Sequence, residues 1–208
     1  GNDYIYASAG SDIIDGGANS DLVDYSASSA GINLTLLDSG ATVSISHNIG
    51  GVASDSLTNI EGIKGSTTAS NTLIGNNMNN TLIGGNQTDT IKGVSGNNSL
   101  SGGAGNDTIF AGTGSDIIDG GAGNDIINVA NMSDLTSADI ITDTSGIDTL
   151  NINGNGTIAS SDFNVSGFEN LNLSNSADVV TFTDKSSFDT FKSKFSSSID
   201  TKGGDDEF

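Results

Sequence analysis

The chain has 208 residues and a formal net charge of −20, because 26 acidic residues stand against six basic ones, all of them lysines. This charge disfavours nucleic acid as a partner and favours cations. The sequence has no Cys, Pro or Trp, which excludes a disulfide framework, a thiolate metal site and a catalytic thiol, and no apolar run approaches the ~18 residues of a membrane span. With 29 glycines and only 34% hydrophobic residues, the composition is close to that of disordered chains unless something neutralises the charge.

A nine-residue period organises two segments, residues 1–25 and 66–128. In the first segment acidic residues recur at Asp3, Asp12 and Asp21. The second segment keeps the period over seven units, whose aligned positions are Asn71, Asn80, Asp89, Asn98, Asp107, Asp116 and Asp125. Two positions after each of these stands an aliphatic residue, namely Leu73, Leu82, Ile91, Leu100, Ile109, Ile118 or Ile127. A fixed period of this kind predicts a repeat architecture with the aliphatic residues in its core.

Residues 26–65 interrupt the period, because the distance from Asp21 to Asn71 is not a multiple of nine. Two segments of alternating polarity, residues 32–36 and 43–45, flank a turn-prone Asp-Ser-Gly sequence at residues 38–40. We therefore predict a β-hairpin insertion or connector docked on the array. The single histidine, His47, falls within it, and we expect it at the surface or in a loop.

Residues 129–183 lack the glycine-rich turns but keep short strand-like runs at irregular spacing. We expect a less regular continuation of the β-helix here. Aspartates such as Asp148, Asp162 and Asp178 have no acidic partner in register, and Ca²⁺ sites need several convergent oxygens. We therefore expect them in turns or in solvent rather than on a metal.

Residues 184–208 combine an amphipathic pattern with an acidic tail. Asp184 is a suitable N-cap, and the apolar residues that follow it at helical spacing are Phe188, Phe191, Phe195 and Ile199. We predict a short helix that covers the end of the solenoid, since solenoids need caps. The alternative is that the helix belongs to an export signal. Because the sequence begins in mid-repeat, we also expect the chain to be a fragment of a larger protein.

The units Gly102–Phe110 and Gly120–Asn128 read G-G-x-G-x-D-x-U-x, where U is a large aliphatic residue, and those around Asp12 and Asp116 are close variants. In this respect the two arrays resemble the calcium-binding nonapeptide repeats of RTX proteins. The resemblance implies an all-β fold, a right-handed parallel β-roll or β-helix solenoid. The connecting segment is similar to modules found between RTX arrays in large secreted bacterial proteins.

Two nonapeptides make one coil of 18 residues, so acidic residues 18 apart stack at about 4.8 Å along one edge of the roll. Asp89, Asp107 and Asp125 form one such ladder, and Asn98 and Asp116 form the other. Stacked carboxylates repel, and a hard divalent cation that accepts six to eight oxygens, as Ca²⁺ does, relieves the repulsion better than Mg²⁺.

The resemblance implies that each ion lies between successive coils and is held by Asp carboxylates and glycine carbonyl groups. The expected pairs are Asp89 with Asp107, Asp107 with Asp125, and Asp3 with Asp21, and Asn98 with Asp116 forms a weaker one. The units at residues 66–83 carry Asn71 and Asn80, whose amides can close the turns without an ion. The metal set predicted in full is Asp3, Asp12, Asp21, Asp89, Asn98, Gly102, Gly103, Gly105, Asp107, Gly112, Gly114, Asp116, Gly120, Gly121, Gly123 and Asp125.

No catalytic motif is found in the sequence: there is no H-E-x-x-H, serine elbow, phosphate-binding loop or dinucleotide fingerprint. A glycosidase needs two carboxyl groups in distinct environments. Here the carboxyl groups repeat in equivalent positions, so we expect no enzyme activity.

The leading hypothesis is an extracellular, secreted module that folds on binding several Ca²⁺ ions. It would serve a structural role in a bacterial surface-layer protein or adhesin, with other copies of itself or a cell-surface glycan or lipopolysaccharide as partner. The alternative is the C-terminal folding and type I secretion domain of an exported protease, lipase or haemolysin. A catalytic motif upstream of Gly1 would favour that alternative.

Overall fold

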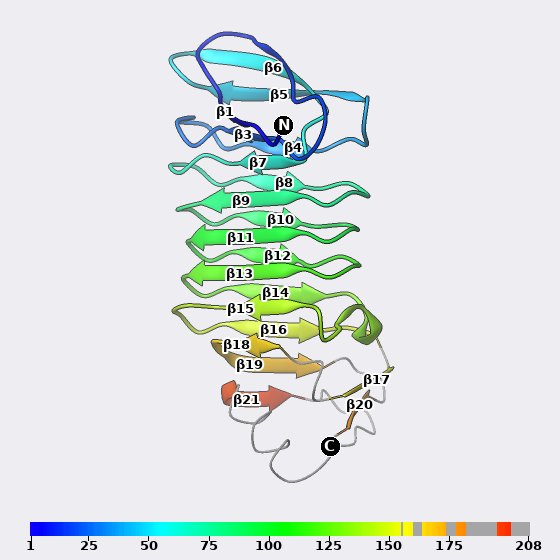
Figure 1. Cartoon of the computed structure of the whole chain (residues 1–208). Helices are drawn as coiled ribbons and strands as arrows, with labels where there is room; N and C mark the ends of the chain where they lie inside the picture. Colours follow the sequence, from blue (N-terminus) through cyan, green and yellow to red (C-terminus); the bar gives the residue numbers. More distant parts are fainter. Residues whose placement is uncertain (155, 160–163, 174–177, 182–194, 201–208) are drawn as a thin grey trace.

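The computed structural model describes the chain except for residues 155, 160–163, 174–177, 182–194 and 201–208. Two parallel eight-stranded sheets face each other and form a column of stacked coils (Figure 1). The predicted all-β parallel solenoid is thus confirmed. In stacking order the first sheet contains β1 (Tyr4–Tyr6), β3 (Leu22–Asp24), β7 (Gly62–Lys64), β9 (Thr81–Gly85), β11 (Ser99–Ala104), β13 (Ile117–Ala122), β15 (Ile140–Thr142) and β18 (Val165–Ser166).

The second sheet alternates with the first along the chain, because each coil contributes one strand to each sheet. In order it contains β4 (Asn33–Thr35), β8 (Thr72–Ile74), β10 (Thr90–Lys92), β12 (Thr108–Phe110), β14 (Ile126–Val129), β16 (Thr149–Ile152), β19 (Phe168–Leu173) and β21 (Phe195–Asp200). A two-stranded sheet pairs β17 (Gly156–Ala159) with β20 (Asp178–Thr181). A three-stranded sheet has the order β2 (Ile13–Asp15), β6 (Val52–Thr58) and β5 (Thr42–Asn48).

The nine-residue period sets the register of the central coils. Ile91 pairs with Ile109, and Leu100 pairs with Ile118, one coil further along. All seven aliphatic residues predicted for the core, Leu73 to Ile127, are at most 1% exposed. At about 25 cal/mol per Å², the burial of one such side chain contributes roughly 1.5–3 kcal/mol, so the stacked aliphatic residues are the main apolar support of the roll.

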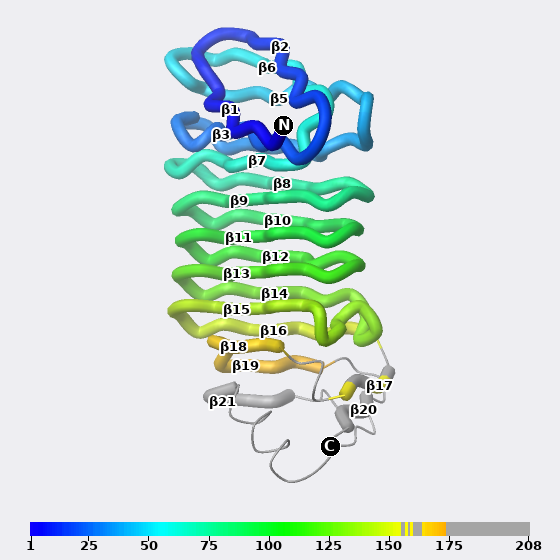
Figure 2. Tube along the Cα trace, in the orientation of Figure 1, coloured from blue at the N-terminus to red at the C-terminus, as the bar shows by residue number. Residues whose placement is uncertain are grey.

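The insertion contains a β-hairpin, but its strands are not those expected from the alternating segments. Residues 32–36 contain β4, which joins the solenoid by pairing in parallel with β8. The antiparallel hairpin is formed by β5 and β6, whose first and last pairs are Thr42 with Thr58 and Asn48 with Val52. It lies at the N-terminal end of the column, where β6 also pairs in parallel with β2 (Figure 2). The predicted turn at residues 38–40 therefore links the solenoid to the hairpin instead of closing it.

His47 is buried in this hairpin at 1% exposure, so its expected place at the surface was wrong. Alternation along β5 turns Ile45 and His47 to the same inner face. The His47 Nε2 atom lies 3.1 Å from Asp55 Oδ1, and the Tyr25 hydroxyl donates to Asp55 Oδ2 at 2.9 Å. The histidine thus joins a buried polar cluster beneath the hairpin.

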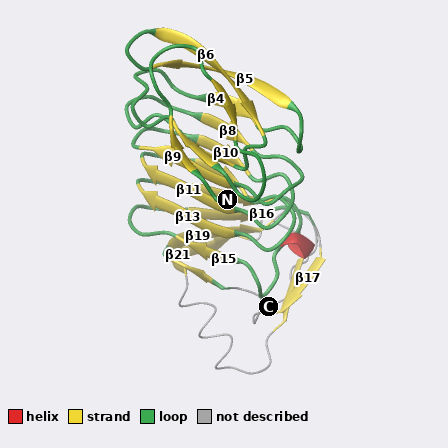
Figure 3. Ribbon diagram, turned by 45° about the horizontal axis from the view of Figure 1, so that its top comes forward, coloured by secondary structure: helices red, strands yellow, loops and turns green. Residues whose placement is uncertain are grey.

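The expected C-terminal helix falls largely in residues 182–194, outside the described part of the chain. Residues 195–200, assigned to the same helix, form β21, which pairs in parallel with β19. A run of three serines, residues 196–198, has weak helix propensity, and pairing satisfies backbone groups at the edge of β19. In the described residues the one helical element is the 3-10 turn η1 (Met132–Asp134), beside β17 (Figure 3).

Candidate metal sites

Two ladders of polar residues run along the column, each just ahead of the strands of one sheet. The acidic ladder precedes strands of the second sheet and consists of Asn71, Asp89, Asp107, Asp125 and Asp148. The mixed ladder precedes strands of the first sheet and consists of Asp3, Asp21, Glu61, Asn80, Asn98, Asp116 and Asp139. Within each ladder a side-chain oxygen of nearly every rung accepts a hydrogen bond from the backbone N–H of the rung before it.

The acidic ladder shows this bond without interruption. The backbone N–H of Asp89 donates to Asp107 Oδ1 and that of Asp107 to Asp125 Oδ1, both at 2.7 Å and across 18 residues. The predicted stacking of these three aspartates is confirmed. On the mixed ladder the Asp3 and Asn98 N–H groups donate in the same way to Asp21 and Asp116. In each of these accepting carboxylates, one oxygen therefore links two coils through a hydrogen bond.

The second carboxylate oxygen is left without a partner along most of the acidic ladder. The Oδ2 atoms of Asp89, Asp107, Asp125 and Asp148 are buried and have no hydrogen-bond partner, and the same is true of Asp21 Oδ2 on the mixed ladder. A buried charged oxygen without a partner costs several kcal/mol unless a cation or a proton satisfies it. These orphan oxygens are the groups to which a metal ion would bind.

Asparagine rungs have no such orphan atom, because the amide supplies its own donor. Asn98 Nδ2 donates to Ser95 O, Gly96 O and Asp116 Oδ1, at 3.0 to 3.2 Å. Asn71 Nδ2 donates in the same way to Ser66 O and Asp89 Oδ1. These rungs close their turns within the chain.

Glycine acts differently at the different positions of the nonapeptide. Gly103 and Gly105, at the second and fourth positions, have φ of 104° and 116°, which favour glycine over other residues. Gly102, at the first position, does not have a left-handed conformation and is needed for space. A Cβ there would lie 2.4 Å from both Asp107 Oδ2 and Gly120 O of the next coil. Gly84 repeats this arrangement with Asp89 Oδ2 and Gly102 O at 2.4 Å.

This glycine geometry brings a carboxylate oxygen and a carbonyl oxygen from successive coils close together. Two oxygens that each lie 2.4 Å from one point are separated by at most twice that distance. Calcium holds its oxygen ligands at about 2.3–2.6 Å, so one ion can bridge both. The residues present therefore fit Ca²⁺, which would be held by Asp89, Asp107 and Asp125 with carbonyl groups of neighbouring coils, and would neutralise the ladder.

The pKa values of several ladder aspartates are raised, which means that the folded roll disfavours their negative charge unless a positive charge or a proton compensates it. Burial, followed by the charges of Asp89 and Asp125, raises the pKa of Asp107 to about 7, although the N–H of Asp89 opposes the shift. Burial likewise raises the pKa of Asp116 to about 6 and that of Asp89 above its ordinary value. The lysines of the described residues do not relieve this: Lys64 bonds to Asp24, and Lys92 lies over the ring of Phe110.

Two predicted ligands lie in different surroundings. The side chain of Asp3 is 59% exposed, at the N-terminal end of the mixed ladder. Asp12 precedes β2, its N–H donates to Asp55 Oδ1, and its own Oδ2 accepts from Ser8 Oγ at 2.7 Å. Neither carboxylate is enclosed like that of Asp107.

Several ladder residues were missed because insertions alter the spacing. Asp148, expected to lack partners in register, accepts the N–H of Asp125 at 2.8 Å across 23 residues, so that expectation was wrong. Asp139 and Glu61 accept from Asp116 and Asp21 in the same way. A signal was present in the sequence, since each is followed two positions later by a buried aliphatic residue: Leu150, Ile141 and Ile63. Asp162 lies outside the described residues, as does the side chain of Asp178.

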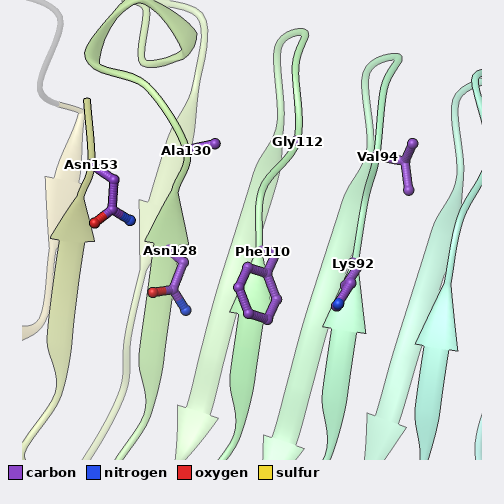
Figure 4. A pocket seen from close by; sticks show the side chains of 7 residues that line it. All are labelled: Lys92, Val94, Phe110, Gly112, Asn128, Ala130 and Asn153. Carbon is purple, nitrogen blue, oxygen red and sulfur yellow. The ribbon is translucent and has the colours of Figure 1, made fainter. Parts of the chain in front are cut away.

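The outer face of the second sheet carries a separate shallow groove lined by Lys92, Val94, Phe110, Gly112, Asn128, Ala130 and Asn153 (Figure 4). Its side chains project from neighbouring strands and turns on the side of the sheet away from the core. The ladder carboxylates are not among its lining residues. In the described residues we also find no helix long and apolar enough to span a membrane.

Stacked coils of nine-residue units with inward-facing oxygens define a β-solenoid of the ion-binding repeat class. Residues 1–27, 66–100 and 92–127 match the family model described as the RTX calcium-binding nonapeptide repeat (4 copies), and these segments belong to that repeat family. No curated protein matches the chain. The predicted family is therefore shown for both arrays, and the hairpin insertion and the residues after 127 lie outside the match.

Proposed function

We propose that the chain is an extracellular calcium-binding β-roll module that folds on binding several Ca²⁺ ions. The observation that carries the proposal is the row of buried Oδ2 atoms without partners at Asp89, Asp107 and Asp125, repeated once per coil. Ions that neutralise this row bind the folded state and not the expanded chain, so their binding free energy adds to folding.

The difference in free Ca²⁺ concentration between the inside and the outside of a cell would decide where the chain folds. Inside a cell, where free Ca²⁺ is scarce, the −20 charge keeps the chain expanded, and millimolar Ca²⁺ outside allows the roll to form. We propose a structural role in a secreted bacterial surface-layer protein or adhesin. The match to a family of structural calcium-binding repeats supports a non-catalytic module.

The test is circular dichroism of the full chain during a Ca²⁺ titration from excess chelator to 10 mM, with Mg²⁺ as the matched control. We expect β-structure to appear cooperatively with Ca²⁺ and far less with Mg²⁺, which prefers a tighter octahedron. Equal β-structure in chelator and in Ca²⁺ contradicts the coupling. Sedimentation of the Ca²⁺ form then tests self-assembly: a monomer at all concentrations argues against other copies as the partner.

A further inference from the structure

The strongest candidate beyond the repeats lies just past their matched region, where three carboxylates meet. Asp125 closes the last regular nonapeptide, and Asp143 and Asp148 belong to the next coil, after an insertion that contains η1. One carboxylate oxygen of each lies within 4.8 Å of those of the other two, and all three residues are buried. The family match ends at residue 127, so neither Asp143 nor Asp148 belongs to a matched repeat.

Each of the three carboxylates divides its oxygens in the same way. One oxygen accepts a backbone N–H: that of Asp107 for Asp125, that of Thr144 for Asp143, and that of Asp125 for Asp148. The other oxygen, Oδ2 in every case, is buried and has no partner. The exposures of the three residues are 0%, 8% and 0%. The cluster therefore holds three orphan oxygens, whereas the Asp89 and Asp107 rungs above it hold one each.

The place of Asp143 in the coil explains how it enters the cluster. Asp119 pairs with Thr142, so Asp143 occupies the first position of its unit, aligned with Gly120. At the rungs above, a carbonyl oxygen of the next coil faces the first-position glycine. At Gly120, a Cβ would instead meet Asp143 Oδ2 at 2.0 Å and Asp125 Oδ2 at 3.0 Å. A carboxylate has taken the place that a carbonyl holds at Gly84 and Gly102.

Burial and the carboxylates around Asp143 raise its pKa further than that of Asp107 in the regular ladder. Burial, with the charges of Asp148, Asp125 and Asp119, raises the pKa of Asp143 to about 8. Burial, then the neighbouring Asp148 and Asp119, also raises the pKa of Asp125. Only oxygen ligands are present in the cluster, which selects a hard cation over Zn²⁺ or copper.

We propose that Asp125, Asp143 and Asp148 form a distinct three-carboxylate Ca²⁺ site that fastens the first enlarged coil to the regular roll. The inference rests on the proposed function, because it requires a chain that takes up Ca²⁺. Its consequence is local: β15 and β16, which follow the insertion, depend on this ion for their attachment to β13 and β14. The competing occupant is a proton shared between Asp143 and Asp148.

The test is equilibrium dialysis of the full chain with ⁴⁵Ca²⁺ at pH 7.4, comparing the wild type with Asp143→Asn and Asp143→Gly. Asp143→Asn keeps the shape and can imitate a protonated carboxyl, and Asp143→Gly restores the residue that stands at Gly102 and Gly120. We expect both variants to bind one ion fewer per chain, or one ion at least tenfold more weakly. Asp38→Asn, which removes the same charge from an exposed loop residue, should bind like the wild type.

Hydrogen exchange in Ca²⁺ locates the effect. We expect Asp143→Asn to remove protection from the amides of β15 and β16 and to spare those of β10 and β12. Unchanged stoichiometry and affinity in both variants would overturn the site and favour the shared proton. Failure of both variants to form β-structure in saturating Ca²⁺ would also overturn it, because Asp143 would then be needed for the fold itself. A wild type that binds no Ca²⁺ contradicts the proposed function instead.

Discussion

The Asp107 rung of the acidic ladder and the Asn98 rung of the mixed ladder lie in neighbouring units, yet the second polar atom of each side chain is satisfied by different chemistry. At Asp107 the oxygen left over after the backbone bond has no partner, whereas at Asn98 an amide group in its place donates to Ser95 O and Gly96 O. The exchange of one oxygen for one NH₂ group thus supplies internal hydrogen bonds where the carboxylate has none. A single roll therefore combines rungs that leave a buried oxygen without a partner with rungs that close within the chain.

The largest expected effect comes from Asp107→Ala, which removes both the acceptor for the Asp89 N–H and the orphan Oδ2 atom. Hydrogen bonds to charged groups contribute about 1.5–3 kcal/mol, so we expect the Ca²⁺ midpoint in circular dichroism to rise roughly 10- to 100-fold.

Asn98→Ala should lower stability by about 1–3 kcal/mol in urea unfolding while the number of bound ions stays the same. Equal changes in ion binding would remove the distinction between the ladders.

Asp107→Asn sharpens the same comparison, because it converts a carboxylate rung into an amide rung. Oδ1 remains to accept the Asp89 N–H, and the amide no longer repels the carboxylates of Asp89 and Asp125. We expect fewer bound ions, measured by equilibrium dialysis, but more β-structure in chelator than the wild type has. An Asn variant as defective as the Ala variant would show that the acceptor oxygen alone is not sufficient.

The pH dependence follows from the direction of the pKa shifts. Burial raises the folded-state pKa of Asp116 to about 6, of Asp107 to about 7 and of Asp143 to about 8, from 3.8. In that interval the folded state binds more protons than the unfolded state, so stability falls as pH rises from about 4 to about 8. In chelator we therefore expect more β-structure, measured by circular dichroism, at pH 5.5 than at pH 8.

Calcium should reverse this order, because it binds the deprotonated carboxylates and competes with protons for them. Circular dichroism at both pH values with 10 mM Ca²⁺ provides the comparison. The Asp107→Asn variant controls for the general effect of net charge, since it should lose part of the pH dependence in chelator. A wild type that is more stable at pH 8 in chelator would contradict the buried, protonated ladder.

Much of the fold and of the ladders follows from the sequence wherever two nonapeptides make a coil. The register of Asp89 with Asp107 and the burial of Leu73 to Ile127 were predicted correctly, because period, core position and turn residues all agree. Asp148 was misjudged because an insertion changes the interval to 23 residues. A search for a polar residue followed two positions later by an aliphatic one tolerates insertions and would have found it.

The hairpin and His47 could not be predicted in this way, because local patterns do not identify strand partners. The alternation in residues 32–36 is the same whether that strand pairs with residues 43–45 or with β8, and the structure has the second arrangement. His47 is buried because β5 pairs with β6 and Asp55 provides a partner for its ring. Both outcomes depend on tertiary contacts between distant parts of the chain.

The smallest predicted effect concerns the turn that precedes Asn98. Val94 occupies the second position of its unit, where Gly103, Gly112 and Gly121 stand in other units, and has a φ of 72°. A left-handed conformation costs an L-residue with a Cβ roughly 1–2 kcal/mol, and a β-branched residue is rarer still there. We expect Val94→Gly to stabilise the Ca²⁺ form by about 1 kcal/mol in urea unfolding. The gain is not larger because glycine loses more conformational entropy on folding, which offsets part of the relieved strain. We expect the ion count to stay the same, because the Asn98 amide already donates to Ser95 O and Gly96 O in that turn. A gain of one ion in this variant would mean that turn strain, and not the amide, keeps a cation from the rung.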